Sequence, residues 1–522
     1  MKKLLTIALL SGLLGTGALA QENHLKIAFA DNLSSLDPQL NNFAGDRSAS
    51  IFFFDTLVED KNGGQLYPAL AESWRNIDPL TWEIKLRSDI LWNNGTPVTA
   101  EDVVYSIERI RNVPGSVAPF TGYVRTIDTV TILDPTTLEI KTNVPNPDLP
   151  LNLTSVYIVN KAVTEQASSE DFNSGKALVS TGAYKLVSYT PGEKVVAEKN
   201  PQYWGEAPVW DTVEYLYMPN AASRTAALLS GGVDVIDKVS VSDLARLQKE
   251  SKVEVFPYDG LRVFLLQPSF NSAVNQYITD NNGKPLPTNP LLDQRVREAL
   301  SIAINREAIA DRILQNGVTV ANQWMPKDST GYNPDIAPIP FDAARAKTLL
   351  AEAGYPDGFQ ITIHVPTDRY PLAPETVQAV AQFWTRIGVK TQVEVVPWAV
   401  YSSAARQNEY AVSVIAWGNG TGEASYAMVN ILATVNPEAG LGASNWGHYS
   451  SEKLDNSLKA VTTEFDSAKR EALMQEAAVT VSEEVGIIPL FHYKNIWAAK
   501  KGLIVKPLRS DRTVPQMVTP QK

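Results

Sequence analysis

The stretch Trp92-Asn93-Asn94-Gly95-Thr96-Pro97-Val98-Thr99-Ala100-Glu101-Asp102-Val103-Val104-Tyr105-Ser106 runs from a turn into a helix. Thr99 is a favoured N-cap residue, and it predicts a helix from Ala100 to about Arg111. Glu101 and Asp102 then lie in the first turn, where the helix dipole favours acidic side chains. Directly upstream, apolar and polar residues alternate over 81–87, which predicts a strand that leads into this turn.

Outward from this stretch, the chain alternates between strand and helix patterns. Strands are predicted around 25–29, 81–87, 389–395 and 487–491, residues 130–160 also have β character, and helices are predicted around 296–303, 342–353, 374–388 and 471–484. From about residue 291 the order is helix followed by strand, which is typical of α/β proteins.

The length and composition indicate a globular protein with more than one lobe. The 522 residues exceed the roughly 250–300 at which a single core stops growing. With 44% hydrophobic and 20% charged residues, disorder, collagen and coiled coil fit poorly. The formal net charge of −11 argues against a nucleic-acid partner. The chain has no Cys, so disulfides, Cys-zinc sites and thiol nucleophiles are excluded.

The first twenty residues have the pattern of a secretory signal peptide. Two lysines at positions 2 and 3 precede an apolar run, which ends in the small residues Ala18 and Ala20. The run is too short to span a bilayer about 30 Å thick. We therefore expect cleavage after Ala20 and an exported, soluble protein.

The sequence offers little reactive machinery. Its four histidines, His24, His364, His448 and His492, are far apart and lack metal-binding spacing. No nucleophile elbow and no phosphate-binding loop occurs, and carboxylates alone cannot be placed at glycosidase separation. We expect no catalytic activity, no metal and no cofactor, with an exported hydrolase of glycans or peptides as the alternative from another class. The 11 Trp and 19 Tyr instead favour recognition, because a cleft between lobes buries a small ligand against aromatic walls.

The motifs resemble those of family 5 extracellular solute-binding proteins, the periplasmic oligopeptide-, dipeptide- and nickel-binding components of ABC importers. The likeness is carried by residues 69–74, 81–87 and 92–106, by 180–184 and 200–204, by 293–306, and by 346–355. These segments cover nearly the whole mature chain in the family's order. They are specific for the family and much less so for the ligand.

The resemblance implies an α/β, two-lobed periplasmic-binding-protein fold (type II, Venus-flytrap) with an extra inserted domain. After the signal peptide 1–20, lobe I would comprise 21–56, 179–270 and 489–522, domain II would be the insertion 57–178, and lobe III would be 271–488. Crossing segments near 270 and 488 would form the hinge. Ligand that contacts both lobes would stabilise the closed form.

Two segments carry the ligand-facing residues that the resemblance implies. Arg369 stands where dipeptide binders present an arginine, and its planar fork suits a carboxylate or phosphate. After the matching Trp417, the family's ammonium-binding aspartate falls on Gly420, which has no carboxylate. Asn419 is neutral, and Glu423 lies three residues further on. Either Glu423 is the anchor, or the ligand has no free amino terminus, since an enclosed, unpaired ammonium is costly.

The predicted function is a periplasmic solute-binding receptor that delivers a peptide or peptide-like solute to an ABC permease in the inner membrane. A non-peptide solute, such as an opine or a sugar conjugate, is the alternative ligand. The resemblance also implies a monomer that meets its permease transiently.

Overall fold

The computed structural model describes residues 23–60, 63–272, 275–367 and 369–521. The predicted signal peptide and its cleavage site after Ala20 lie outside these residues. No helix within the described ranges is both long and apolar enough to cross a membrane.

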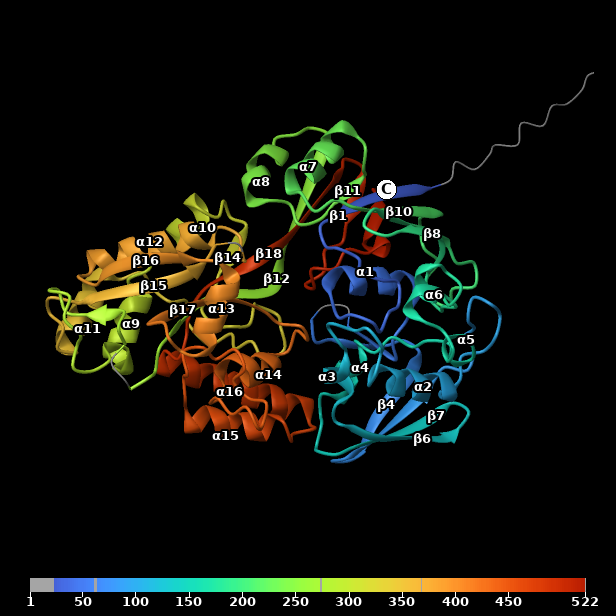
Figure 1. Ribbon diagram of the computed structural model, residues 1–522, viewed down its shortest axis with the longest axis horizontal. Coiled ribbons are helices and arrows are strands. Elements are labelled where there is room, and N and C mark those ends of the chain that lie inside the picture. Colours follow the sequence, from blue (N-terminus) through green and yellow to red (C-terminus); the bar gives the residue numbers. More distant parts are fainter. Residues whose placement is uncertain (1–22, 61–62, 273–274, 368, 522) are drawn as a thin grey trace, which may run out of the picture.

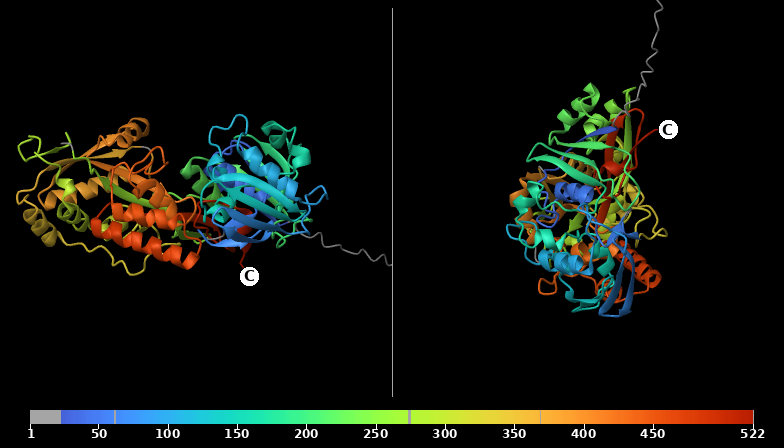
Figure 2. Two further views of the ribbon diagram at one scale, coloured as in Figure 1. Left: turned by 90° about the horizontal axis from the view of Figure 1, so that it is seen from below. Right: turned by 90° about the vertical axis from the view of Figure 1, so that its right-hand side faces the viewer.

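Two bodies of the molecule are joined by two long strands, β12 (Val253–Pro268) and β18 (Ile488–Lys500). In Figure 1 these strands run between a half with α1 to α8 and a half with α9 to α16. Figure 2 shows the same two halves separated when the molecule is seen from below. One mixed sheet of twelve strands passes through both bodies. Ten of them follow the order β13-β15-β17-β12-β18-β11-β1-β10-β9-β8, with β12 and β18 adjacent near the centre, while β14 pairs with β18 and β16 with β15.

The pairing of β12 with β18 is interrupted where the chain passes between the bodies. Asp259 pairs with Lys494 and Val263 with His492, and the register shifts between these two pairs. Before the shift, β18 also pairs with β11 of lobe I, and after it β12 pairs with β17 of lobe III. A second register shift follows between Phe264 and Leu265, and such an interrupted ladder is a suitable hinge because few backbone bonds resist bending there.

Lobe I contains two hydrophobic clusters, one on each side of its part of the sheet. Its elements are β1 (His24–Phe29), α1 (Ala44–Phe53), β8 (Tyr184–Thr190), β9 (Lys194–Lys199), β10 (Thr212–Tyr217), α7 (Ala221–Ser230), β11 (Val235–Ile236), α8 (Val241–Leu247), β19 (Leu503–Val505) and β20 (Val518–Pro520). The predicted strand at 25–29 is confirmed as β1.

Domain II is built around an antiparallel sheet in the order β4-β5-β7-β6 and has its own core. Its elements are β2 (Val58–Asp60), β3 (Leu66–Pro68), β4 (Ala71–Asp78), β5 (Thr81–Leu86), α2 (Ala100–Ile110), α3 (Thr121–Val124), β6 (Ile127–Asp134), β7 (Thr137–Thr142), α4 (Leu149–Leu153), α5 (Lys161–Thr164) and α6 (Ser169–Asn173).

The segment quoted first, residues 92–106, is held together by one carboxylate. The buried Asp102 accepts hydrogen bonds from the backbone N–H of Thr99 at 2.9 Å and of Lys161 at 2.8 Å. The Asn93 N–H donates to the carbonyl of Ser180 at 2.9 Å, which ties domain II to lobe I. These are structural contacts, so the segment specifies the fold rather than the ligand.

The predicted β character of residues 130–160 is wrong beyond Thr142. β6 and β7 account for the first part, but Leu149–Leu153 forms the short helix α4. Pro150 lies in the first turn of α4, where its missing N–H costs nothing. The apolar residues there look strand-like in sequence because a single turn of helix has no periodicity of its own.

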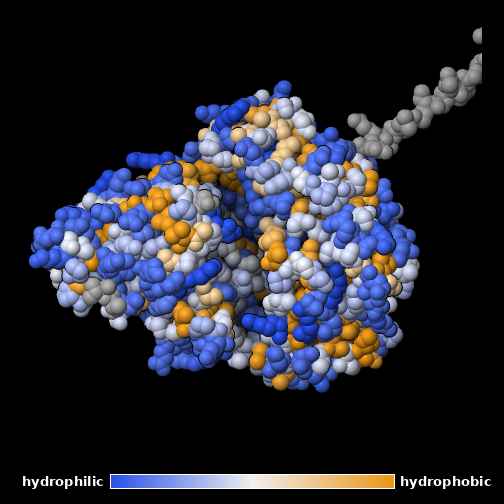
Figure 3. All heavy atoms as spheres, viewed as in Figure 1, coloured by the Kyte–Doolittle hydropathy of each residue, from blue (hydrophilic) through white to orange (hydrophobic). Residues whose placement is uncertain are grey.

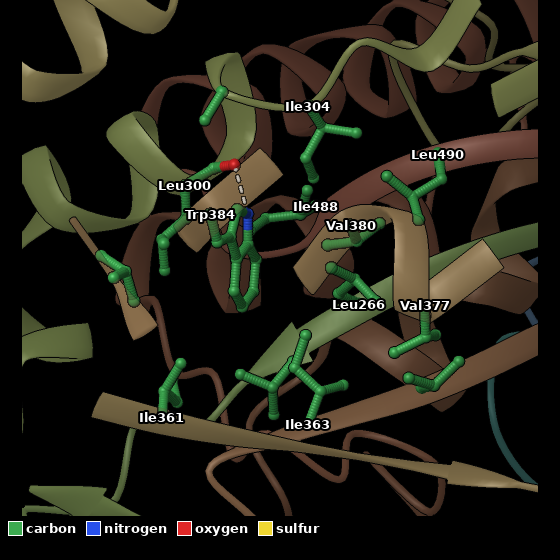
Figure 4. Packing of buried hydrophobic residues seen from close by; sticks show 14 of the residues in the cluster. Leu266, Leu300, Ile304, Ile361, Ile363, Val377, Val380, Trp384, Ile488 and Leu490 are labelled. Atoms are coloured by element: carbon green, nitrogen blue, oxygen red, sulfur yellow. Dashed lines mark hydrogen bonds between the residues drawn. The ribbon is translucent and has the colours of Figure 1, made fainter. Parts of the chain in front are cut away.

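Lobe III contains the largest core, with Trp384 near its centre (Figure 4). Its elements are β13 (Ile278–Thr279), α9 (Gln294–Ile302), α10 (Arg306–Arg312), β14 (Val318–Val320), α11 (Ala343–Glu352), β15 (Gln360–Pro366), α12 (Ala373–Arg386), β16 (Lys390–Val396), α13 (Trp398–Arg406), β17 (Val412–Gly418), α14 (Ala424–Ala427) with a π-helical turn (Met428–Leu432), α15 (Glu452–Val461) and α16 (Ser467–Glu484). The indole N–H of Trp384 donates to the Leu300 carbonyl at 2.8 Å, so this fully buried ring leaves no polar atom unpaired.

Candidate functional site

A hollow opens between the two bodies in the space-filling view (Figure 3). It lies beside the hinge strands, so a solute held there touches both bodies. Two parallel strands of lobe III, β15 and β17, end on the same edge of the sheet. Ligands of α/β sheets bind outside the carboxyl ends of such strands. Arg369 follows β15 and Trp417 is near the end of β17, so the fold places both on this edge.

Trp417 supplies an aromatic surface with an unused donor. Its ring lies against that of Tyr426, with centroids 5.8 Å apart. Within the described part of the chain, its buried indole N–H has no hydrogen-bond partner. A buried donor of this kind costs free energy unless something else accepts from it. Tyr426 was not predicted from sequence, since nothing in its surroundings marks it as facing Trp417.

Asn419 organises the loop that follows Trp417. Its side-chain oxygen accepts from the backbone N–H of Thr421 at 3.1 Å and of Gly422 at 2.9 Å. Its amide donates to the Glu423 carbonyl at 2.8 Å. With these bonds made and the side chain buried, Asn419 shapes the loop, and its role as a ligand contact stays a prediction.

Glu423 is buried and already paired within the protein. Its carboxylate forms an ion pair with Arg470, and Arg470 also lies 2.6 Å from Asp148 of domain II. Burial raises the pKa of Glu423 well above its usual range, and the charge of Asp148 adds to this, while Arg470 opposes it. The anchoring role predicted for Glu423 stays a prediction, and Arg470 now competes with any ligand ammonium for the same carboxylate.

Arg369 is exposed, in contrast to the loop residues. Its guanidinium lies over the ring of Trp398, 5.2 Å from the centroid. It also lowers the pKa of Tyr370, although burial is the larger influence and raises that pKa overall. The structure therefore places Asn419 and Glu423 in the loop that follows Trp417, and the exposed Arg369 after the neighbouring strand β15.

Two residues beside the end of β17 were not found from sequence. They are Arg262, which donates to the Ala416 carbonyl at 3.0 Å, and Tyr426, whose ring lies against Trp417. The two are distant in sequence from each other, and no motif or spacing marks them. In the described ranges, no group of three or more His, Cys, Asp or Glu side chains is arranged to hold a metal ion.

Comparisons with known proteins support this architecture. The chain is 27% identical to Heme-binding protein A of Haemophilus influenzae over 487 residues, 88% of this chain and 85% of the relative. It is 27% identical to the periplasmic oligopeptide-binding protein OppA of Escherichia coli over 507 residues, 91% of this chain and 88% of the relative. The solved structure of HbpA2 from Haemophilus parasuis has a TM-score of 0.82 at 26% identity, covering 96% of this chain and 100% of that one.

These comparisons confirm the predicted two-lobed α/β fold. The predicted residue boundaries of lobe I, domain II and lobe III stay a prediction. The model of the bacterial extracellular solute-binding proteins, family 5 (middle), matches residues 65–439, which is more than half of the chain. On this match, and with the fold and cleft described above, the chain belongs to the family 5 bacterial extracellular solute-binding proteins.

Proposed function

We propose that this protein is a periplasmic receptor that captures a peptide or peptide-like solute between lobes I and III and delivers it to an ABC permease. The observation that carries the proposal is the aromatic pair of Trp417 and Tyr426, which lies at the end of β17, the strand that pairs with the hinge strand β12. Curated relatives include oligopeptide- and dipeptide-binding proteins, which supports the solute class.

The protein would act by binding alone. A solute that contacts both lobes favours the closed form by its differential affinity, and release at the permease leaves the solute unchanged. Export to the periplasm agrees with the signal-peptide pattern and with the periplasmic relatives.

A second ligand class, a non-peptide such as an opine or a sugar conjugate, is favoured by one observation. The carboxylate that would receive a peptide ammonium, that of Glu423, is buried against Arg470. Breaking that pair to admit an ammonium would leave Arg470 with Asp148 as its one remaining acidic partner among the described residues, and loss of a buried ion-pair partner is costly. A solute without a free amino terminus avoids this cost.

Native mass spectrometry of the purified protein tests the proposal. A closed cleft retains solute from the expression host, so we expect a bound mass that disappears after unfolding and refolding. Small-angle scattering should then show a smaller radius of gyration when the solute is returned. Chemical change of the solute at catalytic rates would instead support the exported hydrolase, and a molecule that neither binds nor closes would contradict the proposal.

A further inference from the structure

A second cavity lies within lobe III, apart from the hollow between the two bodies. It has a volume of about 290 Å³, and its walls include Ile302, Trp324, Ala478, Val481, Ser482 and Ile487. These residues come from α9, from the segment after β14, and from α16 and the residues just beyond it. Neither Trp417 nor Glu423 is among its described lining residues. On α16, Ser482 lies twelve residues after Arg470, about 18 Å along a helix, so this lobe III cavity is distinct from the site at the end of β17.

The lobe III cavity lies between two hydrophobic clusters of this lobe. Ile302 belongs to the cluster that contains Trp384. Trp324, Ala478 and Val481 belong to the neighbouring cluster. Protein interiors are packed closely enough to leave few voids larger than a water molecule, so a space of this size between two cores is unusual. It offers a ligand apolar surface from both clusters.

Hydrogen bonds hold the walls of the cavity in place. Gln294 of α9 donates its amide to the Glu483 carbonyl at the end of α16 at 2.7 Å. The side chain of Gln323 donates to the Asn333 carbonyl at 2.8 Å and accepts from the Asn333 N–H at 3.0 Å, which closes the segment after β14 into a loop. A ligand that enters a site with fixed walls pays little for ordering them.

Trp324 supplies a donor that the protein does not use. Its side chain is 3% exposed, and its buried indole N–H has no hydrogen-bond partner among the described residues. Other polar side chains of the wall are engaged, since Ser301 Oγ accepts from Arg306 at 3.0 Å and the Asn322 amide donates to the Ile336 carbonyl at 2.6 Å. A buried donor without an acceptor costs free energy, and a ligand that carries an acceptor removes this cost.

The charged groups of the cavity are acidic. Glu298 is half-buried in its wall, and Glu483 is exposed beside Ser482. No Lys, Arg or His is found among the described residues that line it. Two carboxylates without a facing cation repel an anion, and the repulsion is stronger in an apolar surrounding than in water. The site therefore favours a neutral ligand over an acidic one.

The volume limits the size of this ligand. An engineered apolar cavity of about 150 Å³ binds benzene, and the lobe III cavity has about twice that volume. Two fused aromatic rings fill such a space better than one ring does. The exposed side chains of Ser482 and Glu483 place part of its edge at the surface, where a ligand of this size can enter.

We propose that the lobe III cavity is a second binding site, and that its ligand is a neutral, flat molecule of two fused rings with an acceptor for the N–H of Trp324. This site goes beyond the proposed function, because it uses none of the residues at the end of β17. A ligand held by lobe III alone has no differential affinity for the closed form, so its binding leaves the two bodies free to open and close.

Saturation-transfer NMR titrations of the purified protein at pH 8 with three probes of similar shape test this inference. Isoquinoline has a ring nitrogen that accepts a hydrogen bond, naphthalene has no acceptor, and 2-naphthoate carries a negative charge. We expect isoquinoline to bind with a submillimolar Kd and 2-naphthoate to bind at least tenfold more weakly. Small-angle scattering should show the same radius of gyration with and without isoquinoline.

Two variants locate the probe in the cavity. Trp324→Phe keeps an aromatic ring and removes the N–H, so it should weaken isoquinoline about fivefold and change naphthalene less than about twofold. Ser482→Phe blocks the edge of the cavity from an exposed position and should weaken both probes at least tenfold. Ser230→Phe is its matched control, because Ser230 is also exposed in the last turn of a helix, α7 of lobe I, and it should change neither affinity. Thermal unfolding checks that each variant is folded.

Several results would overturn the inference. If isoquinoline binds Ser482→Phe as tightly as the wild type, or reduces the radius of gyration, the probe occupies another site. Equal losses for isoquinoline and naphthalene in Trp324→Phe would show that the N–H is not the donor, and tight binding of 2-naphthoate would contradict the charge argument. If neither neutral probe binds up to millimolar concentration, the cavity is not a binding site. None of these results bears on the proposed function, which fails only if no solute is retained and the lobes never close.

Discussion

Arg470 on helix α16 of lobe III lies 2.6 Å from Asp148, which precedes helix α4 of domain II. The same guanidinium is paired with Glu423 of the cleft loop, so one cation joins two carboxylates that belong to different bodies of the molecule. The ring of Trp82 lies 6.0 Å from that of Phe465 and makes a second contact between the same bodies. The loop that follows Trp417 is thus coupled to the contact between lobe III and domain II.

Removal of Arg470 should destabilise the protein because it leaves Glu423 buried without a cation. For Arg470→Met we expect the free energy of unfolding at pH 8 to fall by about 3–5 kcal/mol, the cost of removing one partner of a buried ion pair. Urea unfolding followed by circular dichroism measures this value. The double variant Arg470→Met/Glu423→Gln should recover most of the loss, since the unpaired charge is then gone.

The variant Asp148→Asn is the control for this pair. It removes the ion pair between the bodies and leaves Arg470 with Glu423, so it should cost about 1 kcal/mol or less, as partly exposed pairs do. Equal losses in Arg470→Met and in the double variant would show that Glu423 needs no cation, and the coupling described above would be wrong.

Local features of the fold were predictable because neighbouring residues encode them. Asp342 accepts from the N–H of Arg345 and caps α11, as expected from its position before an apolar helical pattern. Helix α16 begins at Ser467, four residues before the predicted start, because Asp466 caps it by accepting from the Lys469 N–H. That capping signal was present in the sequence and was missed.

The electrostatic contacts of the cleft were not predictable in the same way. Glu423 and Arg470 are separated by 47 residues, and neither a period nor a motif connects them. The anchoring role of Glu423 was predicted by alignment on Trp417. That alignment locates the loop in the sequence, but it does not identify Arg470 as the partner of the buried carboxylate.

Substitution of Gly422 should prevent close approach of lobe III to domain II. This glycine has a φ of +74°, and a Cβ there would collide with the backbone of Gly63. We expect Gly422→Ala to hold the bodies apart, which small-angle scattering would detect as a larger radius of gyration than that of the wild type. The left-handed conformation adds a strain of about 1–2 kcal/mol.

The variant Gly95→Ala is the control, because it introduces the same backbone strain as Gly422→Ala without a steric clash. Gly95 has a φ of +85°, yet a Cβ there would meet nothing within 4 Å. This variant should therefore lose similar stability and keep the wild-type radius of gyration. An identical radius for both variants would mean that the contact between Gly422 and Gly63 does not limit approach of the bodies.

The buried Asp237 should make the protein less stable as the pH rises. Burial raises the pKa of Asp237 to about 7, against the charges of Lys238 and Arg224. The folded state then holds a proton that the unfolded state has released, so stability falls with rising pH between about 4 and 7. In urea titrations across this range, the free energy of unfolding of Asp237→Asn should rise relative to that of the wild type as the pH rises. A constant difference would contradict the raised pKa.

His492, on the hinge strand β18, should have the opposite effect on stability. Burial lowers the pKa of His492 to about 4, and the charge of Asp259 opposes this only in part. Between about pH 4 and 6.5 the unfolded state binds a proton that the folded state excludes, so the stabilising contribution is present above pH 6.5 and is lost as the pH falls through this range. Full loss amounts to about 3 kcal/mol, since each pKa unit is worth about 1.4 kcal/mol.

The variant His492→Gln tests this contribution because glutamine does not titrate. Above pH 6.5 the free energies of unfolding of wild type and variant should differ by a constant amount. Below pH 6.5 the free energy of unfolding of the wild type should fall steadily relative to that of the variant. Because Asp237 and His492 titrate in overlapping ranges with opposite signs, the wild type alone should show a flatter pH profile than either variant. An NMR titration that places the pKa of His492 near 6.5 would contradict this prediction, because 6.5 is the ordinary pKa of a solvated imidazole.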